Sequence, residues 1–235
     1  MRTPLAPPSP DESPDQIEFE RAAAFIRDNT LILSPPLVPE LSLHLAEESL
    51  PIWLKTEEEL NKANIDPPYW AFAWAGGQAL ARYILDEPAL VAGKNVLDLG
   101  SGSGLVAIAA CRSGAASATA ADIDPLAAAA ARLNGSLNAA TLQTTVRDLL
   151  AEAPTAYDVI LVGDLFYEAN LAKRVMAFID AAAVKGSKIL VGDPRRSYFP
   201  LDRFERIAEY IVPVSRQLED DETKRTAIWR CRPAG

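Results

Sequence analysis

The residues best suited to chemistry gather in a glycine-rich segment, residues 98–104, which reads Asp-Leu-Gly-Ser-Gly-Ser-Gly. An apolar stretch at residues 96–99 runs into this segment and predicts a strand, and the pattern that follows predicts a helix. Glycines at such a junction allow a tight turn and let a ligand come close to the backbone. The segment is therefore a candidate ligand-binding loop, and its glycines are Gly100, Gly102 and Gly104.

Asp98 and the spacing of the glycines indicate which ligand the loop suits. A dinucleotide fingerprint would place its third glycine at position 105, where this chain has Leu105. A pyrophosphate prefers the N–H groups at a helix N-terminus, and the carboxylate of Asp98 would not help to bind it. That carboxylate can instead accept a hydrogen bond from an ammonium group, directly or through water. The loop therefore suits a ligand with an amino-acid moiety better than it suits NAD.

Further aspartates follow the next two predicted strands. Asp122 ends the second strand, about twenty residues after the glycine loop, where a carboxylate is the usual partner of a ribose diol. Asp124 competes for that role, but its position before Pro125 fits a helix N-cap equally well. Asp148 follows the third strand and is a candidate acceptor for an adenine amino group. We expect Asp122 to hold the ribose, because it lies at the tip of its strand.

A second segment, residues 69–78, combines aromatic side chains with Gly76, Gly77 and Gln78. Aromatic residues at such spacing belong to a core more often than to a ligand site, but the adjacent glycines favour a site. Gln78 can donate a hydrogen bond to a carboxylate, and the two glycines let backbone N–H groups approach one. We expect these three residues and Trp74 to lie at the ligand. The sole histidine, His44, is far from every motif along the chain and is given no catalytic role.

The elements that must position these residues alternate between strand and helix, which predicts an α/β fold with a mainly parallel sheet. The last two predicted strands have no helix between them, so we expect them to pair antiparallel. Strands are predicted at residues 96–99, 118–121, 142–146, 159–162, 189–191, 211–214 and 226–229, and helices at 78–85, 105–113, 125–138, 171–183 and 204–210.

The first 66 residues differ in character from the rest of the chain. Residues 1–16 are rich in proline, serine and acidic residues and are expected to form a flexible tail. Residues 17–66 are predicted to form an extension that packs on the core, leaving residues 67–235 as the principal domain. A helix at 18–29, a short strand at 41–45 and a helix at 56–64, which begins with a capping box, are predicted within the extension.

Composition narrows the classes of protein that fit the chain. A length of 235 residues with 49% hydrophobic residues suits one globular domain with additional N-terminal structure. A net charge of −9 disfavours a general affinity for nucleic acid. The 2 cysteines are far apart and form no CxxC motif, so no zinc site or disulfide framework is expected. Without an apolar signal segment or a long apolar run, we expect a cytoplasmic protein with no membrane span.

Two motifs resemble those of class I methyltransferases that use S-adenosylmethionine (SAM). Residues 96–104 look like their first motif, and residues 122–125, Asp-Ile-Asp-Pro, look like their second. A narrower match joins the tryptophan-rich residues 68–80 to residues 163–167, Gly-Asp-Leu-Phe-Tyr. Together these resemble the lysine methyltransferases of the electron transfer flavoprotein beta subunit and their bacterial relatives. The resemblance covers the chain from about residue 67 onward.

The resemblance implies a fold, a cofactor and an acceptor. The implied sheet has seven strands, the last antiparallel, and with the elements predicted above we expect a Rossmann-like α/β fold with helices on both faces and a helical N-terminal extension. The cofactor is SAM. The acceptor is a protein, namely the electron transfer flavoprotein beta subunit or, as a second choice, a ribosomal protein. Asp164 and Tyr167 occupy the family's acidic-x-x-aromatic motif after the fourth strand, so the resemblance makes them catalytic candidates.

The chemistry of lysine methylation is compatible with a site that has no general base. Lysine attacks as the neutral amine, and neutralising it at about pH 7 costs about 4.6 kcal/mol. Repulsion from a sulfonium about 4 Å away offsets about 4 kcal/mol of that cost at an effective dielectric of about 20. Asp164 would orient the amine, and Tyr167 would shape the lysine channel. A carboxylate also raises the pKa of a nearby lysine, so the benefit of Asp164 must lie in alignment and attraction.

Three alternatives remain open from the sequence. The alternative role for Asp164 is a cap for the helix that begins near Glu168. The same fold serves small-molecule N-methyltransferases, because a fold does not choose its acceptor. A SAM-binding module without catalysis is the third, and the presence of both Asp164 and Tyr167 disfavours it.

Overall fold

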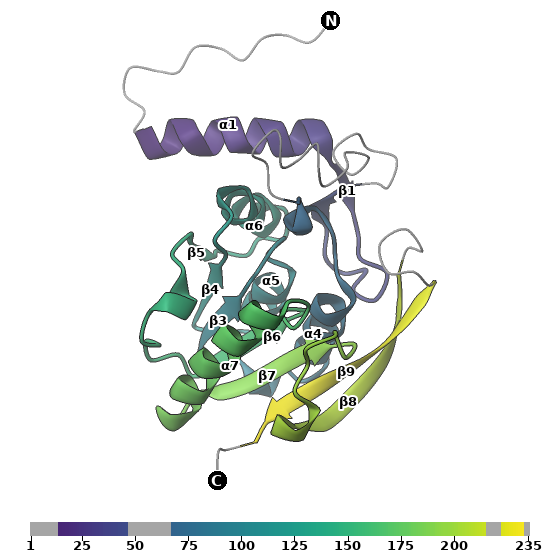
Figure 1. Cartoon of the computed structure of the whole chain (residues 1–235). Helices are drawn as coiled ribbons and strands as arrows, with labels where there is room; N and C mark the ends of the chain where they lie inside the picture. The colour runs from purple at the N-terminus through teal and green to yellow at the C-terminus, as the bar shows by residue number, and fades with distance from the viewer. Residues whose placement is uncertain (1–13, 47–66, 215–221, 233–235) are drawn as a thin grey trace, which may run out of the picture.

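The alternating strands and helices form a seven-stranded sheet with the order β5-β4-β3-β6-β7-β9-β8 (Figure 1). The computed structural model describes residues 14–46, 67–214 and 222–232. Each predicted strand is present, so the α/β class and the seven-strand sheet are confirmed. The strands are β3 Asn95–Leu99, β4 Ser117–Ala121, β5 Gln143–Thr145, β6 Val159–Gly163, β7 Lys188–Asp193, β8 Phe204–Pro213 and β9 Thr223–Cys231.

The interior strand β3 pairs in parallel with β4 on one side and with β6 on the other. Its residue Leu97 stands opposite Thr119 of β4 and opposite Ile160 of β6. Strands that are covered on both faces need apolar residues at successive positions, which is why this part of the sequence reads as short continuous apolar runs. Because β7 also runs parallel to β6, the carboxyl ends of β3, β4, β6 and β7 meet at one edge of the sheet.

Helices cover both faces of the sheet, as expected. Helices α4 (Ala75–Asp86) and α5 (Leu105–Arg112) pack on the face to which Val96 and Leu161 contribute. Helix α7 (Ala169–Val184) packs on the opposite face, to which Leu97 and Ile160 contribute. Neighbouring residues of one strand thus enter different cores, as the two-residue period of a strand requires.

The N-terminal residues add a separate layer over α6 (Pro125–Leu137). Helix α1 (Pro14–Asn29) lies across α6 in Figure 1, and the guanidinium of Arg132 lies 3.7 Å from the centroid of the Phe19 ring. Strand β1 (Leu31–Leu33), which the sequence did not predict, pairs antiparallel with β2 (Leu43–Leu45).

Three predictions for this N-terminal part can be set beside the structure: two elements differ in their bounds, and one lies outside the described residues. Helix α1 begins at Pro14, which is earlier than expected and within the predicted tail. The alternation of leucines predicted a short strand at residues 41–45, and the structure has a shorter one at Leu43–Leu45 whose three residues are all buried. The predicted helix at residues 56–64 lies outside the described residues.

The prediction of a helix at residues 204–210 is wrong, because this segment is the first part of strand β8. Apolar residues at positions 204, 207, 208 and 211 fit the period of a helix. A register shift between Arg206 and Ala208 explains this spacing, since a β-bulge inserts one extra residue into the two-residue alternation. Cross-strand ion pairs stabilise the strand, including Glu205 with Arg230 and Glu209 with Arg225.

Strand β9 lies between β7 and β8 and is antiparallel to both. The expected antiparallel last strand is therefore confirmed. Within the described ranges, no helix combines the length and the apolar character that a membrane span requires.

Candidate active site

Four carboxyl groups lie at the edge where the parallel strands end. Asp98 belongs to β3, Asp122 follows β4, Asp164 follows β6, and Asp193 is the last residue of β7. The sequence predicted that the first three would share this edge. It did not single out Asp193, although an acidic residue two positions after a predicted strand was a visible signal.

The glycine loop connects β3 to α5 with a backbone conformation that residues other than glycine rarely adopt. Gly100, Gly102 and Gly104 have φ values of +67°, +49° and +79°. A Cβ atom on Gly104 would lie 2.9 Å from the Cα atom of Ala131 in α6. The glycines therefore set the shape of the loop, and Gly104 also permits close packing on α6.

Asp98 is buried beneath this loop, with 2% of its surface exposed. Its Oδ2 atom accepts a hydrogen bond of 2.9 Å from the N–H of Ala107, which fixes the start of α5 to the strand. Burial raises the pKa of the Asp98 carboxyl to about 7, with a smaller contribution from the charge of Asp122. A cation that came close would favour the ionised form and reverse this shift.

Asp122 supports the other side of the glycine loop. Its Oδ2 atom accepts from the N–H of Gly102 at 2.9 Å, and its Oδ1 atom accepts from the N–H of Asp124 at 3.1 Å. Burial raises the pKa of this carboxyl. Asp124 is the N-cap of α6 and accepts from the N–H of Leu126 at 2.8 Å, so the cap alternative is correct for Asp124. Ribose binding by Asp122 stays a prediction.

Two other predicted ligand-binding residues have protein partners in the structure. The Nε2 atom of Gln78 donates to the carbonyl of Ala73 at 2.7 Å, and its Oε1 atom accepts from the N–H of Leu37 at 3.2 Å. Gln78 therefore fastens the start of α4 to the N-terminal layer. Asp148 forms an ion pair with Arg174 at 2.6 Å, yet the pair stays partly exposed. Ligand binding by Gln78 and Asp148 stays a prediction.

Asp164 occupies the junction between β6, α4 and the segment after β7. Its φ value is +57°, an unusual conformation for a residue that is not glycine. Its Oδ2 atom accepts from the N–H of Gly77 at 2.9 Å, and its Oδ1 atom accepts from Arg196 Nε at 3.0 Å and from Arg196 Nη2 at 2.7 Å. Strained backbone that is held by several contacts is a feature of functional sites.

The alternative that Asp164 caps α7 is wrong, because Glu168 is the N-cap and accepts from the N–H groups of Asn170 and Leu171. Gly76 and Gly77 were predicted to bring their N–H groups to a ligand. The structure instead gives the Gly77 N–H to Asp164. A Cβ atom on Gly76 would lie 2.2 Å from the Gly192 carbonyl oxygen, so Gly76 lets α4 pack closely on β7.

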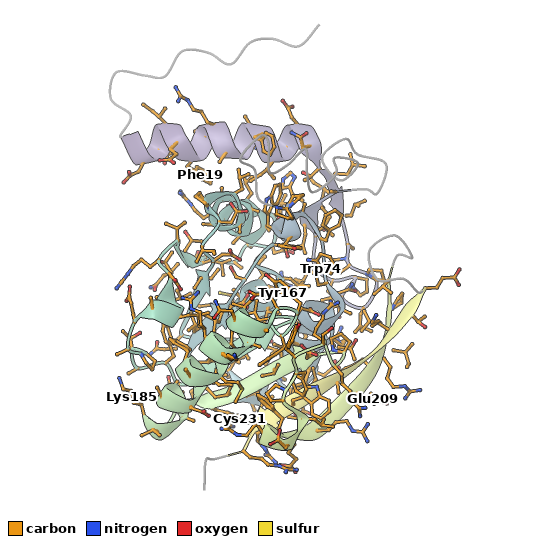
Figure 2. All side chains as sticks on the ribbon, in the orientation of Figure 1. Phe19, Trp74, Tyr167, Lys185, Glu209 and Cys231 are labelled. Atoms are coloured by element: carbon orange, nitrogen blue, oxygen red, sulfur yellow. The ribbon has the colours of Figure 1, made fainter. Side chains whose placement is uncertain are left out.

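Three aromatic residues beside Asp164 form a group that we call the aromatic triad: Tyr69, Trp74 and Tyr167. Tyr69 belongs to the 3-10 turn η1 (Tyr69–Ala71), and its ring centroid lies 6.0 Å from that of Trp74 and 5.7 Å from that of Tyr167. Figure 2 shows Trp74 and Tyr167 at this edge of the sheet. Tyr69 and Tyr167 are each 46% exposed. Their apolar rings are therefore accessible to an incoming chain.

The remaining aromatic residues of the predicted cluster belong to the core. Trp70 and Phe72 are 1% and 4% exposed and pack with residues of α1 and α6. The cluster thus divides between the core and the active-site edge, and the sequence did not show where the division falls. Burial raises the pKa of the Tyr167 hydroxyl, with smaller contributions from Tyr69 and Asp122.

Asn134 of α6 is fully buried and connects the glycine loop to the N-terminal layer. Its Nδ2 atom donates to the carbonyl of Ser103 at 2.8 Å, and its Oδ1 atom accepts from the N–H of His44 at 2.7 Å. The ring Nδ1 of His44 lies 3.1 Å from the hydroxyl of Thr30. The sequence did not single out Asn134, because a lone asparagine within a helix carries no recognisable motif.

Two buried polar atoms at this edge have no hydrogen-bond partner among the described residues, namely the hydroxyl of Ser101 and Oδ2 of Asp193. Leaving such an atom unpaired costs about 1–3 kcal/mol, so a ligand that supplied a partner at the glycine loop would recover part of this cost. The residues present therefore fit a ligand with polar groups. Across the described ranges, no cluster of histidine, cysteine and acidic residues is arranged to hold a metal ion.

The sheet order, the glycine loop and the acidic edge define the class of protein, which is a methyltransferase. The family model for ribosomal protein L11 methyltransferase (PrmA) matches residues 78–186. A crystal structure described as a proposed RNA methyltransferase from Pyrococcus horikoshii shares the fold, with a TM-score of 0.52 and 14% identity over 76% of this chain and 100% of that chain.

Curated relatives identify the family within this class. The electron transfer flavoprotein beta subunit lysine methyltransferase of Danio rerio is 39% identical over 89% of this chain and 83% of its own length. The enzyme of the same name from Homo sapiens is 35% identical over 89% of this chain and 82% of its own length. The chain belongs to the family of electron transfer flavoprotein beta subunit lysine methyltransferases.

The bridge made by Asn134 leads to a prediction about SAM binding. Replacing Asn134 with alanine frees the Ser103 carbonyl and should weaken SAM binding at least about fivefold, which corresponds to about 1 kcal/mol. Asn138 is the matched control, because it binds both the N–H and the carbonyl of Ser42 but does not contact the glycine loop. Asn138→Ala should lower stability without a comparable loss of affinity. Calorimetry on both variants tests this, and equal losses of affinity would contradict it.

Proposed function

We propose that this protein transfers a methyl group from SAM to a lysine of the electron transfer flavoprotein beta subunit. The observation that carries the proposal is the placement of Asp164 and the aromatic triad at the same sheet edge as the glycine loop. The names of the relatives support the choice of acceptor. A net charge of −9 is compatible with a lysine-rich target surface.

The residues of the glycine loop suit the amino-acid and ribose parts of SAM. Asp98 would attract the ammonium group, and Asp122 would accept hydrogen bonds from the ribose hydroxyls. When bound, SAM supplies an electrophilic methyl group on a positively charged sulfur. The protein contributes position and electrostatics, and not the reactive group itself.

For methyl transfer, the acceptor lysine must be bound, aligned with the methyl group and shielded from water. Asp164 accepts a hydrogen bond, first from the incoming ammonium group and, once the proton has left, from the neutral amine. The aromatic triad gives the aliphatic part of a lysine side chain apolar surfaces to contact. The sole histidine of the chain, His44, is buried in β2, so proton removal is assigned to water as the sulfonium lowers the lysine pKa.

A labelling experiment tests the proposed acceptor. Purified electron transfer flavoprotein beta subunit is incubated with the enzyme and isotopically labelled SAM, and mass spectrometry locates the label. We expect label on one or a few lysines, and no label on a beta subunit whose lysines have been chemically blocked. A cell lysate provides the comparison with other acceptors. Label in a ribosomal protein or in small molecules, with none in the beta subunit, would contradict the proposed acceptor.

The raised pKa of Asp98 predicts how SAM binding depends on pH. Burial places the pKa of Asp98 near 7 in the free protein, so the carboxyl is protonated below that pH and ionised above it. Because the ammonium group of SAM favours the ionised form, affinity should be full above about pH 7 and fall by up to about tenfold per unit below it. Calorimetry between about pH 5.5 and 8.5 measures this slope.

Asp98→Asn is the control for the pH dependence, since its amide oxygen can still accept the Ala107 N–H. This variant should bind SAM more weakly at pH 8 and lose the part of the slope due to Asp98. Titration of SAM itself contributes equally to both proteins and cancels in the difference. The same slope in both proteins would assign the effect to another group and contradict the role given to Asp98.

A further inference from the structure

The Asp164 carboxylate is already paired with a cation inside the active site. Arg196 directs Nε and Nη2 at the same oxygen, Oδ1, at 3.0 and 2.7 Å, while Gly77 donates to Oδ2. The side chains of Arg196 and Asp164 are only 18% and 12% exposed. A pair so shielded from water interacts more strongly than an ion pair on an open surface.

Several contacts fix Arg196 in this position. Its backbone N–H donates to Oδ1 of Asp193 at 2.7 Å, and its guanidinium lies 5.6 Å from the centroid of a Trp74 ring. The segment that carries it is held again where the N–H of Tyr198 donates to the carbonyl of Phe166 at 3.0 Å. Arg196 is therefore part of the frame that joins the ends of β6 and β7.

An unpaired Asp164 would work against the reaction in one respect. A carboxylate beside a lysine stabilises the ammonium form, and that form cannot attack a methyl group. Asp193 lies close enough for its charge to act on Asp164, so the edge would carry two carboxyl groups beside the amine. A cation that stays in place beside Asp164 would remove this obstacle.

We propose that Arg196 is a positioning residue that neutralises Asp164, so that the carboxylate aligns the acceptor amine without holding it as an ammonium. The inference rests on the proposed function, because it assumes a lysine acceptor. Arg196 donates to Oδ1 of Asp164, and the N–H of Gly77 donates to Oδ2, so the cation and α4 together fix the plane of the carboxylate. Asp164 then contributes mainly by orienting the acceptor amine, and its negative charge contributes less.

The Tyr167 hydroxyl lies three residues after Asp164, and charges that act on it come from Glu168 in the same segment and from Tyr69 of η1. Asp122 after β4 acts on Tyr167, and α4 contributes the backbone N–H of Gly77. Burial, aided by the charge of Asp164, raises the pKa of Asp193 to about 7, while Arg196 opposes the rise. Loss of Arg196 should therefore move the titration of both carboxyl groups upward.

The test is the pH dependence of kcat at saturating SAM and saturating beta subunit. In Arg196→Gln the acidic limb of the kcat profile should move up by about one pH unit or more, because the bare carboxylate holds the lysine as ammonium. The deficit relative to wild type should therefore shrink as pH rises. Arg196→Lys keeps the charge and should keep the limb within about half a unit of wild type. SAM affinity should stay within about twofold in both variants.

Arg195→Gln is the matched control, because it removes the same charge one residue away. Arg195 faces the Trp229 ring at 6.0 Å and is expected to leave the limb in place. A deficit of Arg196→Gln that is the same at every pH would show a structural role and overturn the inference. If Arg196→Gln does not fold, Arg196→Lys decides: a limb displaced by more than about half a unit overturns the inference.

A second readout does not depend on the acceptor. Carbon NMR of protein labelled at its aspartate carboxyl groups follows the titration of Asp164 directly, and its midpoint should rise in Arg196→Gln but not in Arg195→Gln. An unchanged midpoint would overturn the inference even without an assay. If the wild-type enzyme leaves the beta subunit unlabelled, the proposed acceptor fails, while this titration still decides the role of Arg196.

Discussion

The parallel pairing of β3, β4, β6 and β7 is the constraint on which the site depends, because it brings four carboxyl groups to one edge. Each group loses hydration there, and burial raises the pKa of Asp98, Asp122 and Asp193. The fold offsets this cost with backbone N–H groups from Ala107, Gly102 and Arg196. What remains is an edge that attracts cations, which suits a positively charged methyl donor and a lysine acceptor.

The same edge divides into two parts with different partners. Asp122 accepts from the glycine loop and Asp98 from the start of α5, so both carboxyl groups lie at the proposed cofactor site. Asp164 is held by the N–H of Gly77 in α4 and by Arg196, whose guanidinium lies near the Trp74 ring of the aromatic triad. Because β6 is the neighbour of β3, the two parts lie side by side. In the proposed function, one sheet edge would thus serve two substrates with separate sets of residues.

The sequence predicted the strands of the sheet and the acidic residues at their ends, because short apolar runs and strand-terminal aspartates are local signals. Contacts between distant segments were not visible in it. The pairing of Arg196 with Asp164 joins residues that are 32 positions apart, and the bridge from Asn134 to His44 spans 90. The bulge in β8 misled the prediction for a related reason, since the extra residue gave a strand the spacing of a helix.

The central claim is that Asp164 serves the acceptor and not the cofactor or the fold. Single-turnover methylation of the beta subunit by Asp164→Ala, measured together with SAM affinity and melting temperature, tests it most directly. We predict a rate at least about a hundredfold lower, equivalent to about 2.7 kcal/mol at the transition state, with SAM affinity within about twofold of wild type. A folded variant that binds SAM and methylates at the wild-type rate would contradict the claim.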